Sequence, residues 1–275
     1  YSPDFTAPPG EHEHITVHDL AWLHPEAHTP PALASYLGPV VDRAIRRSTT
    51  VFTVSETVRT EVIDRYDLPP DQVLVATNAA ASAFFGAESL TKEELASLTI
   101  REPFLLYVGS IEPRKNLPVL LEALAMLPEE LTLVVVGNDG GNAEQQLSVI
   151  ERLNLQQRVA RPGFLPDEQL IRLYASAAAV VYPSRHEGFG LPVIEGMAAG
   201  VPVVASDLPV FREVGGDAVT YFDPVDTRSL VEAIDFAISS DASGEVMREV
   251  RRTQALRFDW QTSAAVVARR LQTFA

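Results

Sequence analysis

Two glutamates, Glu187 and Glu195, flank the sequence GFGLPVI, and this arrangement indicates what kind of ligand the segment could bind. Gly188 and Gly190 let the backbone come close to a bound molecule, and Pro192 suits the first turn of a following helix. The N-terminus of that helix would carry unpaired N–H groups and partial positive charge, which favour phosphate. Carboxylates accept hydrogen bonds from hydroxyls and repel phosphate. Hydroxyls and phosphates occur together in a nucleotide sugar. The alternative is a strand-turn-helix corner whose glycines only turn the chain.

A second motif, FLLYVGSIEPRKNL, begins at Phe104 and ends at Leu117. The apolar run predicts a strand that ends at Gly109, and a helix is expected to begin near Asn116 or Pro118. Arg114 and Lys115 thus lie in a strand-to-helix loop, where open α/β sheets bind their ligands. Two cations before a helix oppose its dipole, and a bound anion would resolve that conflict. The alternative is a solvated Arg-Lys pair on a turn.

In combination, GSIEPRKN and EGFGLPVIE resemble the retaining glycosyltransferases of family 4, the group 1 glycosyltransferases with the GT-B fold. The resemblance is strong from about residue 101 to the end. Earlier, VHDLAWLHPE and VFTVSETVR resemble the later half of the family's first domain. The resemblance implies catalytic roles for Arg114, Lys115, Glu187 and His18. It implies donor-binding roles for Gly109, Ser110, Gly163, Phe164, Gly188, Phe189, Gly190, Leu191 and Glu195.

The chain departs from the family at its beginning. The family's N-terminal strands and glycine-rich acceptor-side loop have no counterpart, and the sequence starts at Tyr1 without a methionine. We therefore expect a truncation, with a shorter or split enzyme as the alternative. In the family that this chain resembles, the acceptor side belongs mostly to that region.

The alternation of apolar runs with amphipathic stretches predicts an α/β fold with parallel βαβ winding. Strands are expected at residues 14–17, 51–54, 73–76, 104–108, 131–136, 179–182, 201–205 and 219–222. Helices are expected at residues 33–47, 56–66, 118–127, 143–153, 167–176, 192–199, 227–238 and 244–257, and after Asp259 through Phe274.

The resemblance assigns these elements to two Rossmann-like domains of GT-B type. The complete one would take residues 101–258 and bind the nucleotide sugar. The partial, acceptor-side one would take residues 1–95, with the helix of residues 259–275 packing back on it. Residues 84–100 would link the two.

Further candidate sites are less specific. Residues 137–141, GNDGG, follow a predicted strand and form either a ligand-edge loop or a simple turn. Gly163 and Phe164 follow another short strand, where relatives hold the nucleobase, although Phe164 could equally pack in its loop. His12, His14, His24 and His28 suggest a metal only weakly, because Pro25 and Pro30 interrupt the local geometry. No Asp-x-Asp pair is present to hold a metal on a diphosphate, and we expect no metal and no cofactor.

The composition limits the partners. The net charge of −15 argues against nonspecific nucleic-acid binding, which depends on neutralising phosphates. The absence of cysteine excludes disulfides and thiolate metal sites. No apolar run reaches the roughly 18 residues that span a bilayer. We expect a cytoplasmic enzyme of unassigned oligomeric state, with any peripheral membrane contact made through the missing region.

These observations predict a metal-independent, retaining hexosyltransferase of polysaccharide biosynthesis, with a nucleotide-sugar donor and a hydroxyl acceptor. The likeness favours GDP-mannose, and UDP-glucose and ADP-sugars stay open. One alternative is a nucleotide-binding module or half-enzyme that needs a partner chain. Another is a GT-B epimerase or a phosphorylase, the latter requiring a pyridoxal phosphate lysine that does not stand out.

Overall fold

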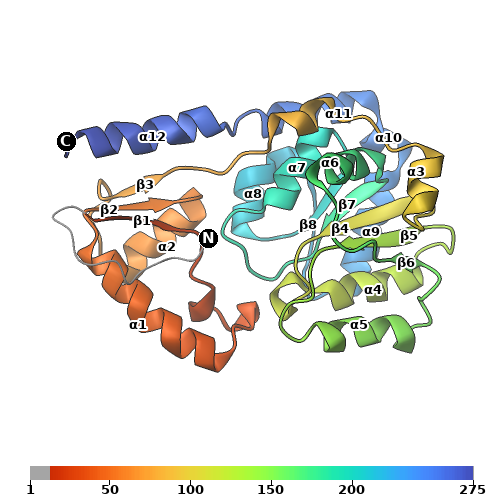
Figure 1. The fold of residues 1–275 in the computed structure, drawn as a ribbon, viewed down its shortest axis with the longest axis horizontal. Coiled ribbons are helices and arrows are strands. Elements are labelled where there is room, and N and C mark those ends of the chain that lie inside the picture. Colours follow the sequence, from red (N-terminus) through yellow and green to blue (C-terminus); the bar gives the residue numbers. More distant parts are fainter. Residues whose placement is uncertain (1–12, 275) are drawn as a thin grey trace. The chain divides into compact units, whose positions relative to one another are not determined.

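The computed structural model describes residues 13–274, without the side chains of residues 240 and 241, and the chain divides into two compact units (Figure 1). The first unit takes the described part of Tyr1–Ala79 together with His186–Phe189 and Phe258–Ala275. The second takes Ala80–Arg185 and Gly190–Arg257. A short loop of four residues in the middle of the chain therefore belongs to the first unit.

The first unit is built on a parallel sheet of three strands in the order β1-β2-β3. These are β1 (His14–Val17), β2 (Thr50–Thr53) and β3 (Val73–Val75). The helices α1 (Pro31–Arg47) and α2 (Glu56–Tyr66) connect them, with the 3₁₀ turns η1 (Ala21–Leu23) and η2 (Pro25–Ala27) after β1. The core combines strand and helix side chains, namely Val17, Leu20, Val41, Ile45, Val51, Val58, Val62, Tyr66 and Val73.

The last helix, α12 (Trp260–Gln272), belongs to this first unit and makes polar contacts with it through Ser263 and Arg270. The Ser263 hydroxyl donates to the carbonyl of Thr77 at 2.7 Å. Arg270 Nε donates to the hydroxyl of Thr50 at 2.8 Å. Asp259 caps the helix by accepting the N–H of Thr262, as the sequence predicts.

The second unit contains a parallel sheet of six strands in the order β6-β5-β4-β7-β8-β9. Its strands are β4 (Phe104–Val108), β5 (Thr132–Val136), β6 (Val159–Ala160), β7 (Ala179–Tyr182), β8 (Val203–Ser206) and β9 (Thr220–Phe222). The chain moves outward from β4 to β6 and then returns to place β7 on the other side of β4. Ligands of such sheets bind where the winding reverses, so the carboxyl ends of β4 and β7 mark the candidate site.

Helices cover both faces of this sheet, which is why its strands read as continuous apolar runs (Figure 1). One group of contacting helices is α4 (Leu117–Met126), α5 (Ala143–Arg152) and α9 (Thr227–Ile238). The other is α6 (Asp167–Ser176), α7 (Leu191–Ala199), α8 (Pro209–Gly215) and α11 (Glu245–Ala255). The α/β class and parallel winding predicted from the sequence are confirmed.

The segment predicted as a link, residues 84–100, is instead part of the second unit. It contains a helix that the sequence prediction missed, α3 (Lys92–Ser97). Thr91 and Glu94 form a reciprocal capping box there, a signal that was readable in the sequence. Arg172 on α6 forms a salt bridge with the Glu94 carboxylate at 2.6 Å. This contact holds the segment against α6 of the second unit.

The predicted elements otherwise differ from the observed ones mainly at their ends. The prediction also missed α8 and the short helix α10 (Ser240–Ser243), whereas the short strand expected before Gly163 is present as β6. The two missed helices are too short for a hydrophobic period to identify.

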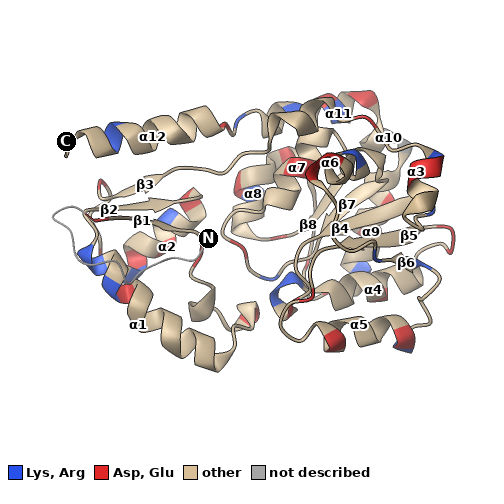
Figure 2. Ribbon diagram, in the orientation of Figure 1, with Lys and Arg blue, Asp and Glu red and all other residues tan. Residues whose placement is uncertain are grey.

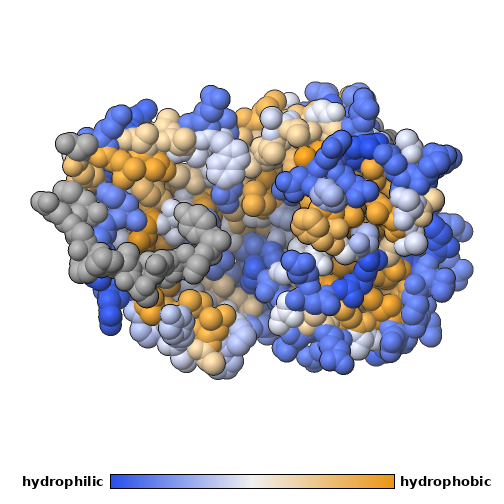
Figure 3. All heavy atoms as spheres, in the orientation of Figure 1, coloured by the Kyte–Doolittle hydropathy of each residue, from blue (hydrophilic) through white to orange (hydrophobic). Residues whose placement is uncertain are grey.

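The surface carries mixed charge and scattered apolar side chains. Figure 2 shows acidic and basic residues spread over both units. Arg46 and Arg47 lie in the last turn of α1, where cations complement the helix dipole. Figure 3 shows hydrophobic surface over α1. Leu33 and Tyr36 of this helix are both exposed. Among the described residues, no helix is both long and apolar enough to cross a membrane.

Candidate active site

The loop after β4 presents the first predicted cation, Arg114, already beside an acid. Its guanidinium binds the Glu112 carboxylate at 2.9 Å, and the Ser110 hydroxyl donates to the same carboxylate at 3.1 Å. Arg114 and Lys115 form a 3₁₀ turn, η4 (Pro113–Lys115), that leads into α4. The sequence interpretation missed Glu112, although an acid two residues from Arg114 was a visible signal. The arginine can therefore be held in place before any ligand arrives.

The second predicted cation, Lys115, is buried rather than solvated, with an exposed fraction of 8%. Its ammonium donates to the hydroxyl of Tyr182, the last residue of β7, and lies 4.8 Å from the centre of that ring. This contact joins the ends of β4 and β7, the two strands at which the winding reverses. The alternative of a solvated Arg-Lys turn is wrong for Lys115.

The loop after β7 meets the loop after β4 directly. The backbone N–H of Arg185 donates to the carbonyl of Arg114 at 2.9 Å. The two motifs singled out in the sequence, about seventy residues apart, therefore share one edge of the sheet.

Gly190 ends this loop and begins α7 in a conformation that suits glycine. Its φ of 99° is left-handed, and a Cβ there would lie 2.6 Å from the ring of Phe211. The helix starts at Leu191 with Pro192 in its first turn, as predicted. Pro192 has no N–H, and the N–H of Val193 donates to the carbonyl of Gly190 at 3.0 Å, so an anion at this end of the helix would meet the amides that precede Pro192 and the positive end of the helix dipole.

The remaining loop residues, His186–Phe189, pack on the first unit. A Cβ on Gly188 would lie 1.7 Å from the carbonyl oxygen of His18, so only glycine permits this approach of two backbones. The side chain of His18 is exposed just beyond the carboxyl end of β1. The structure therefore places the predicted His18 next to the loop that carries Glu187.

Glu195 lies on α7 and is held by a tyrosine that the sequence interpretation did not single out. The Tyr174 hydroxyl, fully buried on α6, donates to Glu195 Oε2 at 2.7 Å. Burial raises the pKa of Glu195 above its usual 4.5, although the Tyr174 hydrogen bond acts in the opposite direction. A carboxylate in this environment gains from further hydrogen-bond donors, such as sugar hydroxyls.

Two outer loops complete the edge of the second unit. Gly163, with a φ of 78°, and Phe164 follow β6, and the Phe164 side chain is 83% exposed. Packing of Phe164 within its loop, one of the two alternatives, is thus wrong. Gly137 packs closely against the loop after β4, because a Cβ added to Gly137 would lie 2.0 Å from the carbonyl oxygen of Gly109. The loop of residues 137–141 therefore supports the loop of Gly109 and Ser110.

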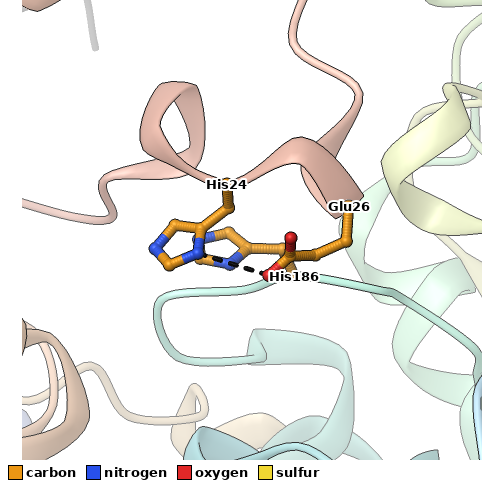
Figure 4. Close-up of side chains that lie close together, drawn as sticks. All are labelled: His24, Glu26 and His186. Atoms are coloured by element: carbon orange, nitrogen blue, oxygen red, sulfur yellow. Dashed lines mark ion pairs between the residues drawn. The ribbon is translucent and has the colours of Figure 1, made fainter.

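A group that could bind a metal occurs in the first unit, and it includes His24, one of the four histidines considered from the sequence. His24, Glu26 and His186 offer ligand atoms within 4.8 Å of one another (Figure 4). His14 and His28 lie outside this group, and His12 is outside the described residues. The sequence interpretation missed His186 because it is far from the other two along the chain.

The geometry of this histidine group favours a stacked pair over a metal centre. The rings of His24 and His186 lie 4.4 Å apart with an interplanar angle of 25°. A nitrogen lone pair lies in the plane of its ring, so stacked rings do not direct theirs at one ion. Both His24 nitrogens face carboxylates, Glu61 at 2.5 Å and Glu26 at 3.3 Å. Burial and the neighbouring His24 charge lower the pKa of His186 below 6.5.

Comparisons with known proteins agree with this arrangement. The family model described as glycosyl transferases group 1 matches residues 91–254, which contain the β4, β7 and α7 elements. The chain belongs to this family. It is 32% identical over 270 residues to the O-antigen chain mannosyltransferase B of Escherichia coli, covering 95% of this chain and 70% of that relative. A serotype-specific mannosyltransferase of Escherichia coli, WbdA, is 30% identical, but only 28% of its length is covered.

Solved glycosyltransferase structures share the fold. HepE of Anabaena, in complex with UDP and glucose, has a TM-score of 0.78 at 22% identity. The match covers 94% of this chain and 71% of the HepE chain. Sucrose-phosphate synthase of Thermosynechococcus elongatus has a TM-score of 0.80 at 23% identity, covering 95% of this chain and 67% of that one. The GT-B fold predicted for this glycosyltransferase is confirmed.

Proposed function

We propose that this glycosyltransferase moves a mannosyl residue from GDP-mannose to a hydroxyl of a polysaccharide acceptor, with retention of configuration and without a metal on the diphosphate. The observation that carries the proposal is the similarity to O-antigen chain mannosyltransferase B over 270 residues. A bacterial surface polysaccharide would be the acceptor class that this relative suggests.

The second unit offers a position for the donor diphosphate. Lys115, Arg114 and the first turn of α7 all lie at the carboxyl ends of β4 and β7. Departure of the nucleoside diphosphate develops negative charge, which fixed cations and helix N–H groups stabilise best in a partly dry site. The burial of Lys115 supports this role. The protein's own cations would thus supply the charge that a metal supplies elsewhere.

The nucleobase would lie farther along the same edge, at Phe164 beyond β6. Strands β4 and β6 are two positions apart in the sheet, or about 10 Å at the usual strand spacing. That separation suits a nucleoside between its diphosphate and its base. The exposed ring of Phe164 offers a face on which a base can stack.

The transferred sugar would meet Glu187, and the ribose would meet Glu195, with the amides of residues 188–191 binding the sugar or the β-phosphate. We assign no protein side chain as a nucleophile. The acceptor hydroxyl would attack on the face that the diphosphate leaves, and a donor phosphate oxygen would take its proton. The new glycosidic bond would thus form as the bond to the diphosphate breaks.

Calorimetric titration tests the donor assignment. We expect the protein to bind GDP more tightly than UDP or ADP, with the same affinity in EDTA. A product assay with GDP-mannose and an O-antigen acceptor tests transfer. Binding without transfer would favour a nucleotide-binding module, and binding abolished by EDTA would overturn the metal-independent mechanism.

Substitution of the two cations should weaken nucleotide binding. Arg114→Ala and Lys115→Ala should each lower GDP affinity about tenfold to a hundredfold, since a hydrogen bond to a charged group contributes roughly 1.5–3 kcal/mol. Lys115→Ala should also lower thermal stability, because it removes a buried side chain that contacts Tyr182. Arg228→Ala, which removes an exposed charge on α9, is the matched control. Unchanged GDP affinity in both variants would refute the assignment.

A further inference from the structure

Ser55 is a fully buried serine two residues beyond β2, and its side chain makes two hydrogen bonds. Its Oγ accepts the N–H of Val58 at 3.1 Å and thereby caps α2. Its hydroxyl also donates a hydrogen bond to the carbonyl oxygen of Gly188, with 2.8 Å between the two oxygens. A helix cap needs only the first of these contacts. The second reaches the loop that carries Glu187, 133 residues away in sequence.

The contact with Gly188 fixes a peptide plane at the centre of the loop. In a planar trans peptide, the carbonyl and the following N–H point in opposite directions. A hydrogen bond that holds the Gly188 carbonyl against Ser55 therefore also sets the direction of the Phe189 N–H. That N–H belongs to the group of amides proposed to bind the donor.

Packing contacts hold the same loop on both sides of this hydrogen bond. Gly188 is pressed against the carbonyl oxygen of His18, and the ring of His186 stacks on that of His24 at 4.4 Å. The Phe189 ring meets Phe258 edge-on at 5.6 Å. These contacts restrict where the loop lies, and the hydrogen bond from Ser55 to the Gly188 carbonyl fixes how the central peptide is turned.

We infer that Ser55 is a positioning residue for sugar transfer: through the Gly188 carbonyl it orients the loop of residues 186–189 and so sets the places of the Glu187 carboxylate and the Phe189 amide. The inference rests on the proposed function, because it assigns Ser55 to the same reaction. Ser55 itself need not touch the donor.

Variants of Ser55 separate loop positioning from helix capping. Ser55→Ala removes both contacts, and Ser55→Thr keeps a hydroxyl that can make both. Ser55→Asn and Ser55→Asp form a pair of similar size in which both side chains can cap α2. Only the asparagine can donate to the Gly188 carbonyl, because an ionised aspartate has no proton to give. Thr91→Ala, which removes the hydroxyl cap of α3 in the second unit, is the matched control.

We expect Ser55→Ala to lower kcat with GDP-mannose about tenfold or more, the size expected for loss of one hydrogen bond from a buried network. The affinity for GDP should change less than about threefold, since Arg114, Lys115 and the start of α7, proposed to hold the diphosphate, lie in the second unit. The Ser55→Thr variant should retain most of the kcat of the unsubstituted protein. The kcat of Ser55→Asn should be higher than the kcat of Ser55→Asp. Amide hydrogen exchange of residues 186–190 should accelerate in Ser55→Ala and not in Thr91→Ala.

Each outcome decides the inference. Equal kcat in Ser55→Asn and Ser55→Asp, or unchanged loop exchange in Ser55→Ala, would reduce Ser55 to a helix cap and overturn it. If Ser55→Ala does not fold, the asparagine and aspartate pair gives the answer. If the unsubstituted protein transfers nothing from GDP-mannose, the proposed function fails. Loop exchange still tests the hydrogen bond in that case.

Discussion

Replacing Gly188 with alanine should lower the rate of sugar transfer by about a hundredfold or more. The added Cβ would lie 1.7 Å from the carbonyl oxygen of His18 and 2.8 Å from its carbonyl carbon. Both atoms are backbone, so no side chain can rotate away, and either the loop or the end of β1 must shift. A displacement of about 1 Å in a reacting group can lower a rate roughly a hundredfold. Steady-state kinetics with GDP-mannose measures the effect.

Gly86→Ala provides the control for this substitution. A Cβ on Gly86 would have no heavy atom within 4 Å, and the same glycine-to-alanine change should therefore leave transfer intact. GDP affinity should survive in Gly188→Ala, because Lys115 and the α7 N-terminus lie in the second unit. Full transfer activity in Gly188→Ala would show that the loop tolerates displacement, and the proposed role of Glu187 would lose its support.

The two glutamates should divide donor recognition between them. Glu187→Ala should leave GDP affinity unchanged while it weakens GDP-mannose binding and turnover. Glu195→Gln should weaken both ligands about tenfold to a hundredfold, since an unpaired buried hydroxyl costs roughly 1–3 kcal/mol. Glutamine is the better choice at position 195, because its side-chain oxygen can still accept from Tyr174. Calorimetry with GDP and with GDP-mannose separates the two roles, and equal effects of both substitutions on both ligands would contradict this division.

The raised pKa of Glu195 gives this prediction a pH dependence. Ribose hydroxyls donate to the ionised carboxylate, so binding lowers the pKa of Glu195 and releases a proton. GDP affinity should therefore increase as pH rises through the free-state pKa. The effect on folding has the opposite sign: the contribution of Glu195 to stability is complete below 4.5 and declines as pH rises through the raised folded-state pKa. Glu195→Gln should remove this part of the pH dependence.

The sequence by itself determined the class of fold and the positions of both motifs. Continuous apolar runs identified the buried parallel strands, and β1, β4 and β7 have the predicted ends. Glycine and proline marked the start of α7, because few other residues tolerate the left-handed φ at Gly190 or suit the first turn of a helix. Such signals are local: each depends on a few neighbouring residues and on backbone sterics. Short pieces such as α8 gave no such signal.

Only the tertiary structure decided which residues meet. It buried Lys115 against Tyr182, placed Tyr174 on Glu195, and joined the loop of residues 186–189 to the first unit through Ser55 and His24. It also assigned residues 84–100 to the second unit, where Arg172 holds Glu94. Hydrophobic periodicity shows which face of an element is buried and does not show its neighbour. These partners lie tens of residues apart, so their contacts follow from strand order and packing and not from any local pattern.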